Sequence, residues 1–224
     1  MYFYQYKVSE YPTINSQKMR IRKMPAIFSK LYPGAWCTLP AKETKTVYIT
    51  FDDGPHPQIT PFVCELLAQY NAAATFFLIG NNMCKHPDFT TEWYSDRGHS
   101  VGNHTYHHLN GFFTENQIYF DDIKQCDLLV RSRLFRPPYG RIKFSQFRYL
   151  SRRYQIVLWD LVTYDWDPTL SPQSICSHIR SNVQNGSIIV FHDSEKAWNN
   201  MSKSLPEILK FLNQEGWNMA KLVV

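Results

Sequence analysis

The sequence predicts a single α/β domain in which strands and helices alternate along most of the chain. From residue 45 onward, short apolar runs of strand length alternate with amphipathic stretches of helix length, a pattern typical of a parallel sheet with crossover helices. Hydrophobic residues make up 44% of the 224 residues, enough for one sizeable core, and no linker or internal repeat divides the chain. We therefore expect about seven βα units in one domain.

The expected strands are apolar runs rich in β-branched and aromatic residues, and they cover 45–51, 73–80, 99–105, 134–140, 154–161, 186–193 and 218–224. The expected helices cover 60–70, 87–96, 114–132, 144–153, 171–183 and 204–216. Helix starts are predicted at Thr60 and Ser171, each followed by proline, and at Thr114 with Gln117 as a capping box. Residues 1–44 are expected to form an irregular N-terminal cover, apart from one helical turn at 25–30, over a catalytic domain of residues 45–224.

Two architectures fit this alternation, a (β/α) barrel and an open doubly wound sheet. In both, the loops that follow the strands gather on one face, so functional side chains are expected at the C-terminal ends of the strands. Ionisable residues do follow several of the expected strands directly. At these positions the sequence departs from that of a generic α/β protein.

Composition limits the expected partners and compartment. The 24 lysines and arginines exceed the 19 acidic residues by only five, and the basic runs at 20–23 and 148–153 are short, so nucleic acid is not an expected partner. No apolar run approaches the ~20 residues of a membrane span, and residues 1–23 lack the apolar core of a signal peptide. The five cysteines form no C-x-x-C pair and are expected to be small core residues in a reducing interior. These features favour a cytoplasmic location, and a monomer is the default expectation.

Two adjacent carboxylates follow the first expected strand. Asp52 and Asp53 stand in the sequence TFDDGP, where Gly54-Pro55 ends the strand. Neighbouring side chains of an extended chain point to opposite sides, so the two carboxylates can serve different functions. The alternative for this segment alone is an Asp-Gly turn followed by a helix cap.

Four of the eight histidines lie within ten residues, in the sequence GHSVGNHTYHH. On a helical turn, His104 and His108 project from one face, at the spacing that lets two imidazoles hold one metal ion. Together with an aspartate they leave open coordination positions, as a catalytic zinc site requires. His107 points elsewhere on this turn and His99 precedes it, so both are expected to be supporting residues.

The segment LFRPPYG places Arg136 at a strand end, before two prolines that make the turn rigid. Tyr139 and Gly140 then offer backbone N–H groups in a fixed conformation. Such groups can stabilise an oxyanion, and the arginine can keep a catalytic carboxylate ionised. The alternative is a Pro-Pro loop with a surface arginine.

Two later strands are also followed by ionisable residues, Asp165 beside Trp166 in one case and His192 in the other. A histidine oriented by an aspartate has a stabilised imidazolium form and can donate a proton to a leaving group. The alternative for His192 is a core histidine with satisfied hydrogen bonds at a strand end.

In their order along the chain, the segments TFDDGP, HTYHH, RPPYG, Asp165-Trp166 and the apolar run ending in His192 resemble the motifs of the polysaccharide deacetylases of carbohydrate esterase family 4. This family shares the nodulation-type chitooligosaccharide deacetylase domain, and the resemblance covers residues 45–224. It implies a distorted (β/α)7-type barrel and a metal-dependent hydrolase that removes N-acetyl groups from N-acetylglucosamine-type residues. The implied partner is an acetylated glycan such as peptidoglycan or a chitooligosaccharide. Because such glycans commonly lie outside the cytoplasm, the periplasm or cell envelope is the alternative location.

The resemblance also implies a role for each matching residue. Asp53, His104 and His108 would bind a divalent metal ion, with Zn²⁺ expected, and Asp52 would be the general base. His192 would be the acid that protonates the leaving group, and Asp165 would orient it. The N–H of Tyr139 would donate to the oxyanion, and Arg136 would pair with the base. Trp166, Val190 and Pro138 would line the acetyl pocket.

Two positions depart from the family pattern. Val162 stands where many members have the first aspartate of DTxDW, and Val190 stands where leucine is usual. Neither change removes a metal ligand, the base or the acid. The alternative functions are an O-acetyl esterase, a cyclic-amide hydrolase and a carbohydrate-binding protein with weak or no catalysis, and the last is disfavoured because all of those residues are present.

Overall fold

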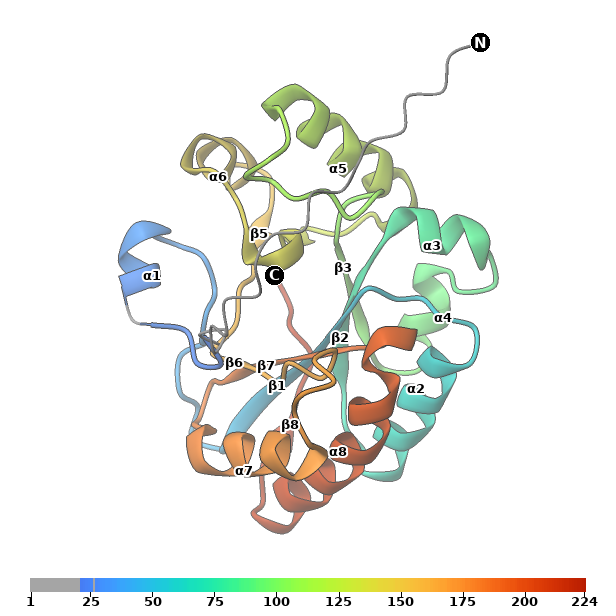
Figure 1. The fold of residues 1–224 in the computed structure, drawn as a ribbon, viewed down its shortest axis with the longest axis vertical. Coiled ribbons are helices and arrows are strands. Elements are labelled where there is room, and N and C mark those ends of the chain that lie inside the picture. Colours follow the sequence, from blue (N-terminus) through green and yellow to red (C-terminus); the bar gives the residue numbers. More distant parts are fainter. Residues whose placement is uncertain (1–20, 26) are drawn as a thin grey trace, which may run out of the picture.

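The strands of the computed structural model, which describes residues 21–25 and 27–224, form one parallel sheet (Figure 1). Within this part of the chain the strand order is β5-β4-β3-β2-β1-β7-β6, and β8 pairs with the start of β1. The strands are β1 Thr46–Asp52, β2 Ala74–Leu78, β3 Ser100–Asn103, β4 Leu134–Phe135, β5 Gln155–Ile156, β6 Leu161–Val162, β7 Ile188–His192 and β8 Asn218–Met219. The predicted parallel arrangement is therefore confirmed.

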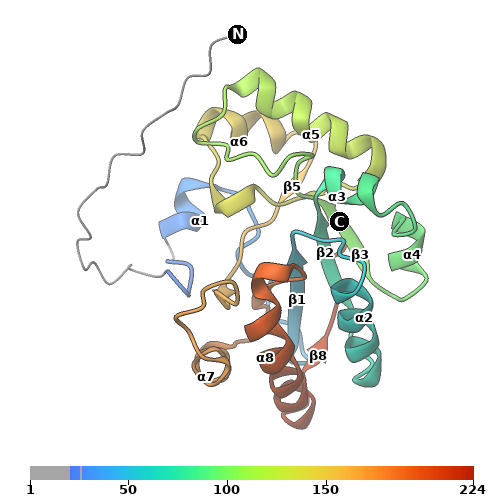
Figure 2. The same cartoon turned by 45° about the vertical axis from the view of Figure 1, so that its right-hand side comes forward.

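Helices surround the curved sheet, with α5 and α6 at one end of the molecule and α2, α7 and α8 at the other (Figures 1 and 2). They are α1 Ile27–Leu31, α2 Ile59–Gln69, α3 Gly80–Lys85, α4 Thr91–Ser95, α5 Asn116–Val130, α6 Phe144–Leu150, α7 Pro172–Asn182 and α8 Glu195–Gln214, with a 3₁₀ turn at Pro138–Gly140. Among the described residues, none of these helices is long and apolar enough to cross a membrane.

The expected strand at 154–161 is wrong as one element, because β5 and β6 are separate and do not pair with each other. The N-terminal segment bonds to the residues between them. The N–H of Leu158 donates to the carbonyl of Trp36 at 2.8 Å, and the N–H of Met24 donates to the carbonyl of Asp160 at 2.9 Å. The described part of the expected N-terminal cover thus lies across the open seam of the barrel, while residues 1–20 and 26 lie outside the described residues.

The predicted helix starts are confirmed only in part. Ser171 caps α7, where its side chain accepts from the N–H of Ser174 at 3.1 Å. Thr60 is not a cap, because α2 begins at Ile59. The proposed box at Thr114 is also wrong: α5 begins one residue later, and Glu115 is its N-cap. The hydroxyl of Thr60 donates to Asp193 instead, and that of Thr114 donates to the carbonyl of Asn110.

The core lies between the sheet and the helices that cover it. All seven residues of β1 are buried, as expected for the strand at the centre of the sheet. The inner face of α8 contributes Leu205, Ile208, Leu209 and Leu212, each fully buried. Three of the cysteines are buried as expected, but Cys37 is half-buried and Cys84 is exposed near the end of α3, so the expectation of five core cysteines is wrong.

We predict that Leu209→Ala lowers the free energy of unfolding by about 3 kcal/mol, because it removes a fully buried side chain and leaves a cavity. Urea denaturation measures the change. Leu128→Ala is the matched control, because Leu128 is 73% exposed and its truncation should change stability by less than ~0.5 kcal/mol. Equal losses in the two variants would contradict the assignment of α8 to the core.

Candidate active site

The ionisable residues that follow the strands meet at the C-terminal edge of the sheet. In the register of β1 and β7, Asp52 lies directly opposite His192. The last residues of β3 and β4 also pair, so His104 and Arg136, the next residue on each, are neighbours. The structure therefore brings together segments that lie up to 140 residues apart in the chain.

Asp53, His104 and His108 each offer a ligand atom, and these atoms lie within 4.8 Å of one another. Oδ1 of Asp53 is 3.2 Å from Nε2 of His108 and 3.7 Å from Nε2 of His104. Two imidazole nitrogens and one carboxylate oxygen are a donor set that Zn²⁺ accepts, and they leave open coordination positions. The residues present thus fit the expected metal ion.

The segment that carries the two histidines is a loop, so the expectation of a helical turn is wrong. Thr105 and His108 have φ angles of 64° and 58°, in the left-handed region that an α-helix excludes. His99, expected to support this site, lies buried in the sheet, where its Nδ1 accepts from the N–H of Ala74 at 3.2 Å.

Asp122 holds this loop in place, and the sequence interpretation missed it. Its buried carboxylate accepts from the N–H of Tyr106 at 2.8 Å, from the N–H of His107 at 3.0 Å, and bonds the ring of His107 as well. The available signal was its position on the inner face of α5, one turn from the buried residues Tyr119 and Cys126. A carboxylate on an apolar face needs partners.

The environment of His104 keeps it neutral. Burial lowers its pKa to about 4. Nδ1 lies 2.7 Å from the carbonyl oxygen of Arg136, which can only accept, so Nδ1 carries the proton and Nε2 is free to bind a metal ion.

Asp53 is held as a carboxylate. Burial alone would raise its pKa, but the imidazole of His108 and the nearby charge of His192 hold the pKa of Asp53 well below its usual range. Asn82 orients this segment by donating to the carbonyl of Asp53 at 2.8 Å. The Tyr139 hydroxyl lies 3.1 Å from Nδ1 of His108, which leaves Nε2 facing Asp53.

Asp52 forms a buried ion pair with Arg136. The guanidinium, 1% exposed, donates from one nitrogen to Oδ1 of Asp52 at 2.7 Å and to the hydroxyl of Thr50 at 2.8 Å. Its other terminal nitrogen donates to the carbonyl of Leu158 at 2.9 Å. The alternative of a surface arginine is therefore wrong. Oδ2 of Asp52 faces the metal-ligand cluster, 4.0 Å from Nε2 of His104.

His192 is paired with Asp165. One carboxylate oxygen accepts from Nδ1 of the ring at 2.8 Å, and the other accepts from the backbone N–H of His192 at 2.9 Å. Burial alone would lower the pKa of His192, but the charge and hydrogen bond of Asp165, together with the charges of Asp53 and Asp52, raise it to about 9. The ring is therefore an imidazolium at neutral pH and can donate from Nε2.

Of the residues expected to line an acetyl pocket, Trp166 contacts this histidine. The ring of Trp166 packs edge-on against His192, with ring centroids 4.4 Å apart. Val190 lies two residues earlier on β7, paired in register with Val162. Pro138 is buried at the start of the 3₁₀ turn. Asp165 bonds both the ring and the backbone N–H of His192. Val162, at the position of the other family aspartate, therefore leaves this contact intact.

Tyr139 has a left-handed backbone with a φ of 61°, and its side chain is 60% exposed. Its ring packs against that of His108, with centroids 4.6 Å apart. This contact with a ligand histidine was not anticipated from the sequence. The role of its N–H as an oxyanion donor stays a prediction.

Asp193, which the sequence interpretation also missed, supports the turn that carries Asp53. It is fully buried, and burial raises its pKa to about 8. The hydroxyl of Thr60 donates to Oδ2 at 2.6 Å, which explains why this threonine does not cap α2. A Cβ on Gly54 would lie 2.3 Å from the same oxygen, so only glycine fits between the turn and the carboxylate.

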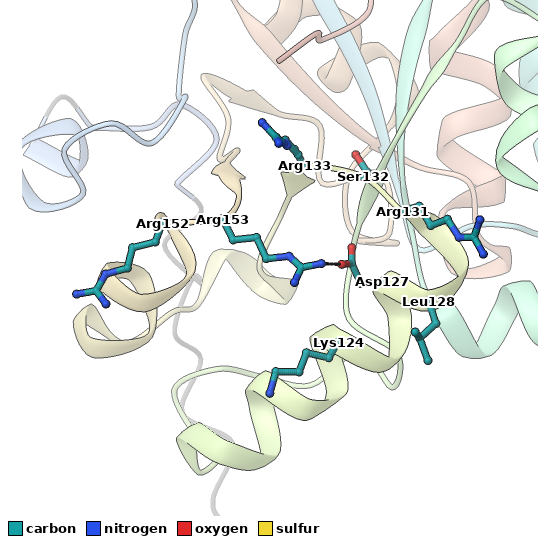
Figure 3. A pocket seen from close by; sticks show the side chains of 8 residues that line it. All are labelled: Lys124, Asp127, Leu128, Arg131, Ser132, Arg133, Arg152 and Arg153. Atoms are coloured by element: carbon teal, nitrogen blue, oxygen red, sulfur yellow. Dashed lines mark hydrogen bonds and ion pairs between the residues drawn. The ribbon is translucent and has the colours of Figure 1, made fainter.

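A hollow of about 750 Å³ lies elsewhere, beside the N-terminal ends of β4 and β5 (Figure 3). It is lined by Lys124, Asp127, Leu128, Arg131, Ser132, Arg133, Arg152 and Arg153. Arg153 pairs with Asp127, whereas Arg131 and Arg152 extend away from each other (Figure 3). None of the candidate active-site residues lines this hollow, so it is separate from the candidate active site.

Comparisons with known proteins support the resemblance to the polysaccharide deacetylases. A family model described as polysaccharide deacetylase matches residues 40–156, just over half of the chain. The peptidoglycan-N-acetylglucosamine deacetylase of Bacillus cereus is 36% identical over 183 residues, which cover 77% of this chain and 84% of that protein. The chitooligosaccharide deacetylase of Azorhizobium caulinodans is 36% identical over 159 residues, which cover 66% of this chain and 73% of that protein.

Solved structures share the fold. That of the Bc1960 peptidoglycan N-acetylglucosamine deacetylase has a TM-score of 0.77 at 29% identity, over 88% of this chain and 94% of that one. Bacillus subtilis PdaA, a family 4 carbohydrate esterase, has a TM-score of 0.73 at 22% identity, over 88% of this chain and 87% of that one, and supports the fold alone. The barrel fold and the resemblance inferred from the motifs are confirmed.

We predict that Asp122→Asn weakens zinc binding tenfold or more, because the carboxylate that orders the loop between His104 and His108 is lost. Competition with a chromophoric chelator measures the affinity. Asp121→Asn is the matched control, because Asp121 is the adjacent residue and its side chain bonds only Gln117 and Lys124 among the described residues. Similar affinities in the two variants would show that Asp122 does not order the site.

We also predict that the imidazole of His192 titrates near pH 9 in the zinc-free protein and that Asp165→Asn lowers this pKa. The sign follows from the environment: burial disfavours the cation, and without the Asp165 carboxylate only the charges of Asp53 and Asp52 oppose it. NMR titration of the ring protons measures both values. An unchanged pKa in the variant would contradict the pairing.

Proposed function

The chain belongs to the polysaccharide deacetylase family, and from this membership and the site geometry we propose that it hydrolyses N-acetyl groups on N-acetylglucosamine-type residues of a glycan. Asp53, His104 and His108 would hold the divalent metal ion, with Zn²⁺ expected. The relatives named above are deacetylases of peptidoglycan and of chitooligosaccharides, which supports this class of substrate. A cytoplasmic location, with the periplasm or cell envelope as the alternative, and a monomeric state stay predictions.

One observation carries the proposal: the base and the acid lie side by side at the ends of neighbouring strands, next to the cluster of three ligand residues. Asp52 ends β1 and His192 ends β7, at directly paired positions. Arg136 forms an ion pair with Asp52, and Asp165 forms one with the imidazolium of His192. A hydrolase that breaks an amide needs both a proton acceptor for the attacking water and a proton donor for the leaving amine.

A bound Zn²⁺ supplies Lewis-acid chemistry, polarising the acetamide carbonyl and lowering the pKa of water towards ~7. Asp52 accepts the proton of the attacking water through Oδ2, because Oδ1 is occupied by Arg136. The N–H of Tyr139 donates to the oxygen that becomes negative when the carbonyl is attacked.

His192 completes the reaction. It donates the Nε2 proton to the sugar nitrogen as the C–N bond breaks, because its Nδ1 is held by Asp165. Acetate and a free amine result. Trp166 packs against the ring of His192, and Val190 lies on β7, the strand of His192. These two side chains line the space for the acetyl methyl group.

We expect purified protein to release acetate from N-acetylglucosamine oligomers with zinc and to lose this activity with chelator. His108→Ala and Asp52→Asn should each lower kcat/KM at least 100-fold, because one removes a ligand and the other removes the base. His86→Ala, a histidine outside the cluster, is the matched control.

Two outcomes would contradict this assignment. Release that survives both chelator and His108→Ala would exclude the metal-dependent mechanism. No release from N-acetyl oligomers or peptidoglycan, with one equivalent of zinc bound and with acetate released from an O-acetylated polysaccharide, would replace the N-deacetylase with an O-acetyl esterase.

A further inference from the structure

Two exposed phenylalanines stand on the loop between β3 and α5, shortly after the metal-ligand segment. Phe113 is 81% exposed and Phe112 is 49% exposed. They follow His108 by five and four residues, so they belong to the loops at the C-terminal ends of the strands, the same edge as the site. Large aromatic side chains held in water at such a place indicate a binding surface.

The turn that presents these rings is built from several hydrogen bonds. The side chain of Asn110 accepts from the N–H of Phe112 at 3.1 Å, and its carbonyl accepts from the N–H of Phe113 at 3.1 Å. The same carbonyl accepts from the hydroxyl of Thr114 at 2.8 Å. The exposed rings are therefore carried by an ordered turn, which lowers the entropy lost when a ligand binds them.

The loop is also fixed to the segment that follows the Pro-Pro turn. Gln146 donates to the carbonyl of Gly111 at 2.9 Å, and Lys143 donates to the carbonyl of Thr114 at 2.7 Å. A Cβ on Gly111 would lie 2.6 Å from the carbonyl oxygen of Arg141, so the two segments are in close contact.

These contacts connect the phenylalanines to the metal-ligand cluster. The guanidinium of Arg141 lies 5.9 Å from the ring centroid of Phe113. Tyr139, two residues before Arg141, is 60% exposed and packs against the ring of His108. An aromatic and cationic surface therefore runs outward from a ligand histidine.

We propose that Phe112 and Phe113, with Tyr139 and Arg141, form an aromatic platform that binds sugar residues of the glycan beyond the one that is deacetylated. The proposal rests on the proposed function. A pyranose ring has an apolar face of C–H groups that stacks on an aromatic ring, and its hydroxyl and acetamide oxygens accept from a guanidinium. The platform selects a glycan of several units over a single sugar or a small cyclic amide.

The test compares kcat/KM for N-acetylglucosamine oligomers of two and five units. In Phe113→Ala, the ratio of the pentamer value to the dimer value should fall about five- to tenfold, the effect expected for loss of one aromatic stacking contact. Phe113→Trp should restore the ratio. Tyr149→Ala is the control, because this ring is 49% exposed but stacks on Phe120 at a different surface. An unchanged ratio in Phe113→Ala would overturn the platform.

Binding of the pentamer to the zinc-loaded protein, measured by calorimetry, separates failure of the platform from failure of the function. Wild-type protein that releases no acetate from any oligomer would refute the proposed function. The platform would then stand only if wild-type protein binds the pentamer and Phe113→Ala binds it at least fivefold more weakly. Equal affinities, or no binding by the wild-type protein, would overturn the platform as well.

Discussion

The buried ion pair between Arg136 and Asp52 organises the candidate site. The guanidinium bonds groups on β1 and on the segment after β5, through Thr50, Asp52 and the carbonyl of Leu158. The carbonyl of the same arginine accepts from His104. One residue thus sets the orientation of both the proposed base and a candidate metal ligand. Removing either charge would leave the other buried and unpaired, at a cost of about 3–5 kcal/mol.

Two histidines of the candidate site have pKa values shifted in opposite directions. Burial lowers the pKa of His104 to about 4, and Asp165 raises that of His192 to about 9. Both rings are buried or nearly so, and both are held through Nδ1, one by a neutral carbonyl and the other by a carboxylate. The partner of Nδ1 therefore decides which ring is neutral with a free Nε2 and which favours the imidazolium form.

Left-handed backbone conformations concentrate around the site, at Asp53, Thr105, His108 and Tyr139. Such conformations are unfavourable for residues other than glycine, and they persist only where the surrounding structure holds them. Buried aspartates from distant elements contribute to that support. The carboxylate of Asp122 accepts from backbone N–H groups of the histidine loop. Asp193, which directly follows β7, packs against Gly54 in the turn of Asp53.

The sequence by itself determined the parallel α/β arrangement and the residues that meet at the strand ends, because element type follows from local periodicity and parallel strands end at one edge. Only the tertiary structure decided that β5 and β6 separate around the N-terminal segment, that His104 and His108 lie on a loop, and that Asp122 holds this loop. Each of these features depends on which hydrogen-bond partner a distant element brings within reach, and local periodicity contains no information about that choice.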